Sequence, residues 1–287
     1  MSSSHEQPLA AQAIAPASQT VSDLPKRAIG IDVGGTGIKG GIVNLHKGTL
    51  TGDRFRIPTP KPATPEAVAE VIGQILDELL GREKAPAESE LSVGVLFPAI
   101  VDKNIVLSAA NIDESWINTD AAALLRHLPG EIHTLNDADG AGLAEARYGA
   151  GKGHDGTVMT ITLGTGIGSA LVHDGVLVPN SELGHLEFEG EVAEKKASAA
   201  ARERADMPWD EYGRLLNRYL VHVERLQSPE MFIIGGGISK RSEDFLPYVT
   251  DLRAEVECAA LQNNAGIVGA ALYAAEQTRL NQSRGRS

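Results

Sequence analysis

The sequence predicts an α/β protein in which two lobes face each other across a cleft. Strand-like and helix-like segments alternate along most of the chain, which is the order of elements in α/β folds. A unit of strand, glycine-rich turn and second strand occurs near residue 30 and again near residue 160. Two lobes built around these similar units account for both observations.

Composition limits the classes of protein to which the chain can belong. The 287 residues are 42% hydrophobic and 22% charged, enough apolar material for a buried core. The single cysteine, Cys258, can form neither an internal disulfide nor a cysteine-ligated zinc site, so we expect a cytoplasmic protein without structural zinc. No apolar segment reaches the roughly 18 residues needed to span a bilayer. The formal net charge of -12 disfavours nucleic acid as a partner.

Changes in composition suggest where the lobes begin and end. Residues 1–24 are rich in Ser, Ala, Gln and Pro and are expected to be a disordered tail, and residues 281–287 a second one. Residues 25–137 are expected to form a small N-terminal α/β lobe, and residues 138–265 a large C-terminal α/β lobe. A final helix over 266–280 is a candidate to pack on the first lobe.

A hairpin and a helix are predicted first. Residues 28–35 form an apolar strand that ends in glycines, and residues 37–45 form a second strand. Thr64 and Pro65 suit the cap and first position of a helix, apolar residues then recur at helical spacing, and Gly81 ends the helix.

Two strands and a second helix follow. Residues 92–97 and 133–135 are predicted strands, and a helix is predicted from Asp139, as its cap, to Gly149. Residues 151–156 contain three glycines and are predicted to be a loop or a joint between the lobes.

The second half of the chain repeats the alternation. The predicted elements are a strand over 157–163, a strand ending in an Asp174-Gly175 hairpin turn, helices over 192–204 and 209–226, a strand over 231–234 and the helix over 266–280.

Three glycine clusters end three of the predicted strands. Glycine tolerates positive φ and lets backbone N–H groups approach an anion without a side chain in the way. One cluster alone could be only a turn, but three clusters at strand ends favour phosphate binding. The members are Gly34, Gly35, Thr36 and Gly37; Gly164, Thr165 and Gly166; and Gly235, Gly236 and Gly237.

Two charged residues flank the first cluster. The Asp32 carboxylate is placed to hold Mg²⁺ through water beside the phosphates, or only to cap the turn. Lys39 could add a positive charge to the phosphate path or lie exposed on the second strand.

The first cluster also matches a dinucleotide-binding pattern. Gly35, Gly37 and Gly40 fit G-x-G-x-x-G, which requires a helix immediately afterwards. The residues that follow, IKGGIVNL, are typical of a strand, so a nicotinamide site is disfavoured. The P-loop pattern is absent.

Asn136 and Asp137 are the predicted centre of the chemistry. Phosphoryl transfer needs an aligned hydroxyl and a carboxylate that accepts its proton. An amide beside a carboxylate at a strand end suits neighbouring sugar hydroxyls. Asp139 is the rival base, but its position favours a helix cap.

Further polar ligands are predicted near residue 185. Glu182 and His185 are three residues apart and could reach one ligand, or could form an ordinary surface loop. Glu194 opens a predicted helix, where the helix dipole by itself favours a carboxylate.

Taken in order, the motifs resemble those of a known family. IGIDVGGTGIKGGIV, LND, LGTGIGSAL, ELGH and FIIGGGIS, spread over residues 26–275, resemble the ROK sugar kinases. The resemblance is strongest to their bacterial branch of polyphosphate glucokinases and glucomannokinases.

The resemblance implies an actin-like ATPase fold and a hexokinase-type reaction. It implies that Asp137 is the general base for the 6-hydroxyl of glucose, or of mannose, with polyphosphate or ATP as donor and Mg²⁺ as cofactor. It also implies a homodimer. The residues that match sugar-contacting positions of the family are Asn136, Glu182, His185 and Glu194, with Asn111 a weaker match.

One departure from the family pattern bears on zinc and on the donor. Many ROK proteins carry a cysteine-rich zinc loop after the ELGH-type motif, whereas residues 186–193 contain no cysteine. We therefore expect no zinc at His185. The polyphosphate branch of the family is similar in lacking this loop, which suggests polyphosphate as the phosphoryl donor. A strictly ATP-dependent glucokinase and a non-catalytic sugar-binding protein stay open as alternatives.

Overall fold

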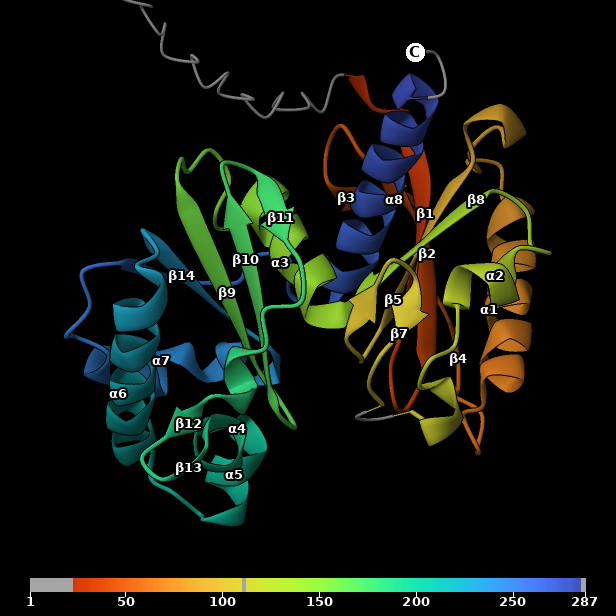
Figure 1. Cartoon of the computed structure of the whole chain (residues 1–287). Coiled ribbons are helices and arrows are strands. Elements are labelled where there is room, and N and C mark those ends of the chain that lie inside the picture. Colours follow the sequence, from red (N-terminus) through yellow and green to blue (C-terminus); the bar gives the residue numbers. More distant parts are fainter. Residues whose placement is uncertain (1–22, 110–111, 285–287) are drawn as a thin grey trace, which may run out of the picture.

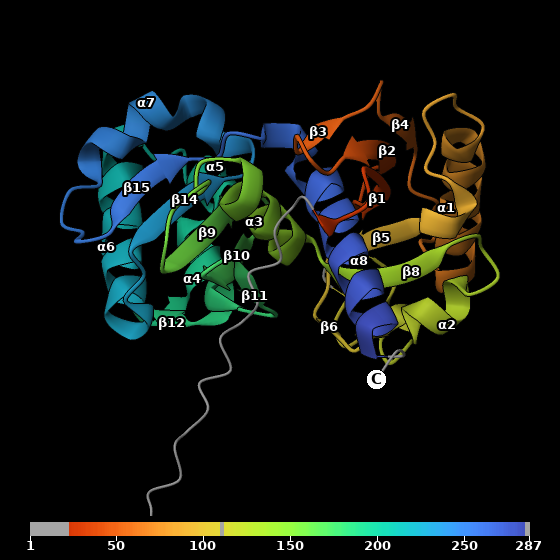
Figure 2. The same ribbon diagram turned by 90° about the horizontal axis from the view of Figure 1, so that it is seen from above.

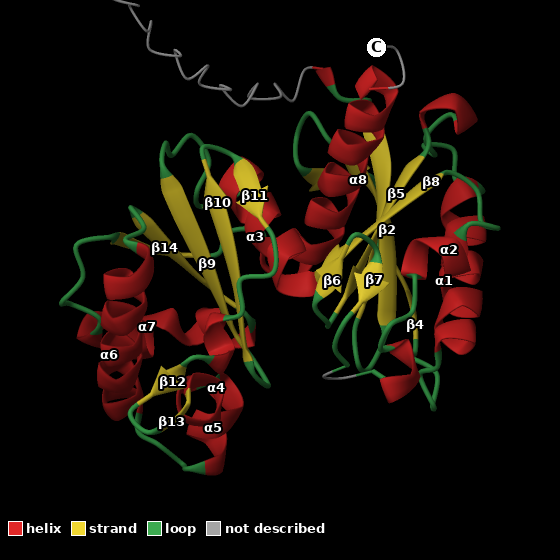
Figure 3. Ribbon diagram, viewed as in Figure 1, coloured by secondary structure: helices red, strands yellow, loops and turns green. Residues whose placement is uncertain are grey.

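The computed structural model describes residues 23–109 and 112–284. Two sheets stand side by side, with helices α3 (Asp137–Tyr148) and α8 (Ala265–Arg284) packed against each other between them (Figures 1 and 2). Figure 3 shows the strands in two groups with further helices on their outer sides. The α/β class and the two lobes predicted from the sequence are confirmed. The predicted tails fall mainly outside the described residues.

The first sheet brings three strand ends to one edge. Its order is β3-β2-β1-β5-β8, with β4 paired to β2. Strands β1, β5 and β8 are parallel, so their carboxyl ends lie together, at Val33, Phe97 and Asn136. The bounds are β1 Arg27–Val33, β2 Ile38–Asn44, β3 Thr49–Leu50, β4 Phe55–Ile57, β5 Ser92–Phe97 and β8 Glu131–Asn136.

The second sheet has the order β11-β10-β9-β14-β15. Its hairpin turn at Asp174 and Gly175 has φ values of 49° and 78°, as a two-residue hairpin of primed type requires. The bounds are β9 Thr157–Leu163, β10 Ile167–His173, β11 Val176–Val178, β14 Met231–Gly235 and β15 Glu255–Cys258. Two short pairs complete the strands: β6 Val101–Asp102 with β7 Ile105–Val106, and β12 Glu187–Phe188 with β13 Glu191–Val192.

Most helices begin where the sequence predicts. Helix α1 has Thr64 as its cap, whose hydroxyl accepts a hydrogen bond from the Ala67 N–H. The helix predicted over 192–204 is instead two helices, because Ser198 ends one and caps the next. The bounds are α1 Pro65–Leu80, α2 Ala121–Leu125, α4 Ala193–Ala197, α5 Ala199–Arg204, α6 Trp209–Gln227 and α7 Ser242–Phe245.

Leu24 and residues 281–284, which lie in the predicted tails, belong to the folded structure. Leu24 is buried, with 4% of its surface exposed, in a cluster under α8, and α8 continues four residues past 280 to Arg284. α8 packs on β1 and β5 of the first sheet. The division of the chain between residues 137 and 138 stays a prediction.

The backbone after the first glycine turn excludes the dinucleotide interpretation. Strand β2 begins at Ile38 and pairs antiparallel with β1, so no helix follows Gly37. A pyrophosphate on a helix N-terminus therefore has no place at this turn. In residues 23–109 and 112–284, no helix is long and apolar enough to cross a membrane.

The layer between the sheets depends on close backbone contacts at glycines. A Cβ atom built on Gly269 of α8 would lie 1.7 Å from the carbonyl oxygen of Gly140 in α3. A Cβ on Gly30 of β1 or Gly94 of β5 would lie 1.9 Å from carbonyl oxygens of α8. Any larger residue at Gly269 would force the two helices apart.

We expect Gly269→Ala to lower the free energy of unfolding by about 1–3 kcal/mol, since the added methyl overpacks the contact between two backbones. Urea unfolding followed by circular dichroism measures the change. Gly73→Ala in α1 is the matched control, because its Cβ would meet only the end of the Leu128 side chain, at 3.3 Å. Equal stability of the two variants would show that the α3–α8 contact is not close.

Candidate active site

One cavity gathers half of the site residues predicted from the sequence. It has a volume of about 320 Å³ and lies where the carboxyl ends of β5 and β8 face the β9–β10 turn. Ligand sites of open α/β sheets lie at this edge. The predicted residues on its wall are Asn136, Asp137, Gly164, Thr165, Gly166, Glu182, His185, Glu194 and Gly236.

Asn136 caps helix α3. Its Oδ1 accepts a hydrogen bond from the Asp139 N–H at 3.0 Å, and its Nδ2 donates to the Ala99 carbonyl at 3.0 Å. The prediction that Asp139 is the cap was therefore wrong: the cap lies three residues earlier, at Asn136, because an asparagine side chain satisfies the free N–H groups as well as an aspartate does. Asn136 thus holds the cavity wall in place.

Asp137 is the first residue of α3 and lies partly buried on the cavity wall. Its Oδ1 accepts a hydrogen bond from the Ala138 N–H at 2.8 Å, which favours the ionised form. Burial, and after it the negative charges of Asp32 and Glu182, raise the pKa of its carboxyl to about 6. The group is therefore mostly ionised at neutral pH and still basic enough to accept a proton.

Asp139 points away from the cavity. It is fully buried, and its Oδ2 accepts a hydrogen bond from the Asn180 N–H at 2.7 Å. Burial raises its pKa to about 7. The Asp139 side chain has no exposed surface and does not line the cavity, so a ligand in the cavity would meet Asp137 and not Asp139.

His185 lies between two glutamates. Its Nε2 is 3.7 Å from an oxygen of Glu182, and its Nδ1 is 4.0 Å from an oxygen of Glu194. The His185 side chain is 62% exposed, whereas those of both glutamates are 31% exposed. Burial raises the pKa of Glu182, His185 lowers it and Glu194 raises it. These groups offer several acceptors and a histidine donor to a polyhydroxyl ligand.

The second glycine turn is fitted against Glu194. A Cβ on Gly166 would lie 2.4 Å from the Glu194 carboxylate, which accepts a hydrogen bond from the Ile167 N–H at 3.4 Å. Glycine at 166 therefore lets the turn and the carboxylate share one wall of the cavity.

The first glycine turn lies beside this cavity and not on its wall. The Gly34 N–H donates to the Gly37 carbonyl at 3.2 Å, and Arg56 donates to the Thr36 carbonyl at 2.7 Å. Asp32 precedes the turn and forms an ion pair with Lys39 at 3.7 Å. Burial raises the pKa of Asp32, while Lys39 and Arg54 lower it.

The third glycine cluster lines a second, smaller cavity. Gly235, Gly236 and Gly237 bound a space of about 120 Å³, together with Lys240 and Asn263. Thr162 and Gly236 belong to the walls of both cavities, so the two spaces adjoin. Asn111, the weakest of the predicted sugar ligands, lies outside the described residues.

Sequence reasoning missed several residues of the site. Thr162 and Ser169 line the first cavity, Lys240 lines the second, and Arg56 holds the first glycine turn. Hydroxyls inside strands carry no pattern that distinguishes them from other strand residues. The only one of these residues that a sequence pattern could have indicated is Arg56, because arginines alternate with apolar residues in RFRI, residues 54–57.

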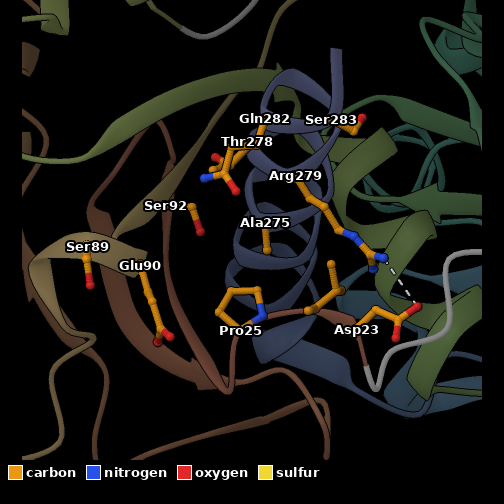
Figure 4. A pocket seen from close by; sticks show the side chains of 11 residues that line it. Asp23, Pro25, Ser89, Glu90, Ser92, Ala275, Thr278, Arg279, Gln282 and Ser283 are labelled. Carbon is orange, nitrogen blue, oxygen red and sulfur yellow. Dashed lines mark ion pairs between the residues drawn. The ribbon is translucent and has the colours of Figure 1, made fainter. Parts of the chain in front are cut away.

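A larger cavity, of about 460 Å³, lies elsewhere (Figure 4). Its wall includes Ser92 at the start of β5 and Arg279 of α8, which forms an ion pair with Asp23 at 3.3 Å. It therefore lies at the amino ends of the parallel strands, opposite to the edge that carries Asp137. None of the predicted site residues lines it.

No group of three or more His, Cys, Asp or Glu side chains in residues 23–109 and 112–284 is arranged to bind a metal ion. Asp32 nevertheless suits Mg²⁺, which commonly uses one or two carboxylates and keeps several waters. Its negative charge acts on Asp137, and a cation between the two carboxyls would relieve that repulsion.

Comparison with known proteins decides the family, since residues 28–197 match the ROK family. The chain belongs to the ROK family. It is 45% identical to the polyphosphate glucokinase of Mycobacterium tuberculosis over 88% of this chain and 93% of that protein.

Two solved structures extend the comparison of this ROK chain. The inorganic polyphosphate/ATP-glucomannokinase of Arthrobacter sp. strain KM matches with 59% identity and a TM-score of 0.81, covering 88% of this chain and 100% of that one. A ROK glucokinase of Streptomyces griseus, in complex with glucose and AMPPNP, matches with 26% identity and a TM-score of 0.71, covering 87% and 99%. The predicted actin-like fold with two lobes is confirmed.

We expect the Asp137 carboxyl to titrate near pH 6 and its pKa to fall in Asp32→Asn, because that change removes a neighbouring negative charge. Carbon-13 NMR titration of the carboxyl, assigned by its loss in Asp137→Asn, measures both values. Asp210→Asn, which removes an exposed carboxylate on α6, is the control and leaves the titration unchanged. If the pKa of Asp137 is near 4 and does not change in Asp32→Asn, the two carboxyls do not interact.

Proposed function

We propose that the protein is a hexose 6-kinase that transfers a phosphoryl group from inorganic polyphosphate, or from ATP, to glucose. The observation that carries this proposal is the position of Asp137. Its ionisable carboxyl and the Gly164–Gly166 turn line the same cavity, so a sugar alcohol beside the carboxyl would face a phosphate held by the turn.

The polar residues around Asp137 bind the sugar. Glu182, Glu194 and Asn136 supply acceptors, and His185 supplies a ring N–H; together they hydrogen-bond neighbouring hydroxyls of one hexose ring. Fixing the ring in this way aligns the 6-hydroxyl with the phosphate, which is the main task of a phosphoryl-transfer enzyme.

Asp137 then acts as the general base. It accepts the proton of the 6-hydroxyl while that oxygen forms a bond to the terminal phosphorus. The bond from that phosphorus to its bridging oxygen breaks, and the shortened polyphosphate or ADP leaves with the electron pair. Backbone N–H groups of the glycine turns at residues 34–37 and 164–166 bind the phosphate oxygens, with Gly235–Gly237 and Lys39 beside them. Mg²⁺ held by Asp32 through water would neutralise charge on the phosphates.

Three observations support polyphosphate as a donor. The chain is 45% identical to a protein named as a polyphosphate glucokinase and 59% identical to a polyphosphate/ATP-glucomannokinase, against 26% for a glucokinase bound to an ATP analogue. It also lacks the cysteine-rich loop of many ROK proteins. We place the reaction in the cytoplasm and infer a homodimer from the family.

A donor panel tests the proposed function directly. We expect glucose 6-phosphate from both long-chain polyphosphate and ATP, and mannose 6-phosphate from mannose at a lower rate. A coupled dehydrogenase assay for glucose 6-phosphate and chromatography for mannose 6-phosphate measure the products. Product with ATP alone would make the protein a strictly ATP-dependent glucokinase, and no product with either donor would favour a non-catalytic sugar-binding protein.

Replacing the base separates chemistry from binding. We expect Asp137→Asn to lower kcat by roughly 10²–10⁴-fold, since the amide cannot accept the proton, while the dissociation constant for glucose measured by calorimetry changes little. Asp139→Asn is the matched control, because that side chain is buried away from the cavity and an amide oxygen can still accept the Asn180 hydrogen bond. Near-normal turnover in Asp137→Asn would refute its role as base.

A further inference from the structure

Two arginines in and next to β4, Arg54 and Arg56, lie near the first glycine turn. Arg54 donates to the Asn263 carbonyl at 3.5 Å, and Arg56 donates to the Thr36 carbonyl at 2.7 Å. Within the described residues neither forms an ion pair. The chain has 38 acidic and only 26 basic residues, so carboxylates are plentiful. Several other arginines form ion pairs with them: Arg82, Arg147, Arg214, Arg218, Arg241 and Arg279.

The strand pairing puts three cations on one face. Lys39 of β2 is directly opposite Arg56 of β4, and Arg54 lies two residues before Arg56. Phe55 and Ile57, which alternate with the arginines, pack against the hydrophobic core of the first lobe. The side chains of Lys39, Arg54 and Arg56 therefore share the opposite face, and we call these three residues the basic edge.

Holding these cations together costs stability. Like charges directly opposite each other in an antiparallel pair repel. Asp32 offsets part of this positive charge, through its ion pair with Lys39 and through its attraction to Arg54. Arg54 and Arg56 are exposed, so their guanidinium groups are available to a ligand from solution. A bound anion would relieve the repulsion.

The basic edge adjoins the phosphate-binding elements. Arg56 lies against Gly37 so closely that a Cβ there would be 2.4 Å from its Nε. Arg54 bonds to Asn263, which lines the second cavity, and Lys240 lines that cavity too. An anion that extended past the glycine turns would meet these charges.

We propose that the basic edge binds the distal phosphates of a long polyphosphate chain, those beyond the phosphates held by the glycine turns. This inference rests on the proposed function. A nucleoside triphosphate carries its charge on three phosphates and continues as an uncharged nucleoside, whereas each phosphate of polyphosphate is charged. Cations beyond the turns therefore add affinity for polyphosphate selectively, and they attract it to a chain whose net charge is negative.

The test compares donors of increasing length. For the wild-type protein we expect the KM for polyphosphate to fall as the chain lengthens from tripolyphosphate to long chains. In the Arg54→Gln/Arg56→Gln variant we expect the KM for long chains to rise roughly tenfold at low salt and the dependence on length to flatten. Because Arg56 also holds the first glycine turn, the comparison with ATP uses Arg54→Gln alone, in which the KM for ATP should change far less than the KM for long chains. Added salt should narrow the difference between the two proteins.

The control variant carries the same change of charge elsewhere. Arg214→Gln/Arg225→Gln removes two positive charges from α6 and should leave the dependence on length unchanged. Arg54→Gln alone provides a second test if the double variant unfolds, because its one hydrogen bond is a long one of 3.5 Å. Arg54→Lys should restore most of the lost affinity.

Three outcomes would overturn the inference. An unchanged KM for long chains in the double variant would show that the basic edge does not contact the donor. Equal losses with ATP and with polyphosphate in Arg54→Gln would show that the basic edge does not act on the distal phosphates. Failure of the wild-type protein to use polyphosphate of any length would remove the proposed donor as well, and glucose phosphorylation from ATP would then separate that failure from loss of the kinase assignment.

Discussion

The arrangement of the site depends on the contact between α3 and α8. The two helices cross at Gly140 and Gly269, within the first two turns of each, so their N-termini converge. Asp137 is the first residue of α3, and the Asp32 carboxyl lies against Gly266 in the first turn of α8. Both helix N-termini carry partial positive charge that favours anions. The contact thus links the packing of the two lobes to the electrostatics of the site.

The carboxyl groups of Asp137 and Asp139 lie in different environments, although the two residues are close in sequence. Asp137 lies on the cavity wall, and its pKa of about 6 lets it be ionised and yet basic at neutral pH. Asp139, two residues later, is sealed inside the protein with its pKa raised to about 7. The difference arises because successive side chains at the start of a helix point in different directions, one to the cavity and one to the Asn180 N–H. Position on the helix therefore selects which aspartate can meet a substrate.

The cavity around Asp137 and the basic edge differ in the charged groups that they carry. Around Asp137 the cavity wall carries carboxylates and backbone N–H groups, which under the proposed function would orient a sugar and a phosphate. No lysine or arginine is among the described residues that line it. The basic edge on β2 and β4 lies just beyond, where repulsion among Lys39, Arg54 and Arg56 is tolerated because two of them face solvent. Separation of the two regions would let one enzyme accept a short donor and gain affinity from a long one.

The sequence by itself determined the main elements and half of the residues that line the cavity. Glycine clusters at strand ends, the Thr64 cap and the Asp174-Gly175 turn are local signals, and they placed β1, β2, β9, β10 and α1 because backbone conformation at such residues is set by near neighbours. Only the tertiary structure decided that Asn136, and not Asp139, caps α3, that Ser198 divides one predicted helix, and that Lys39 faces Arg56. The two caps are local bonds, but Asn, Asp and Ser have similar preferences for the cap position, so the local pattern could not choose among neighbouring candidates. The pairing of Lys39 with Arg56 depends on which strand lies opposite, and a pattern read along the chain carries no information about partners far away in it.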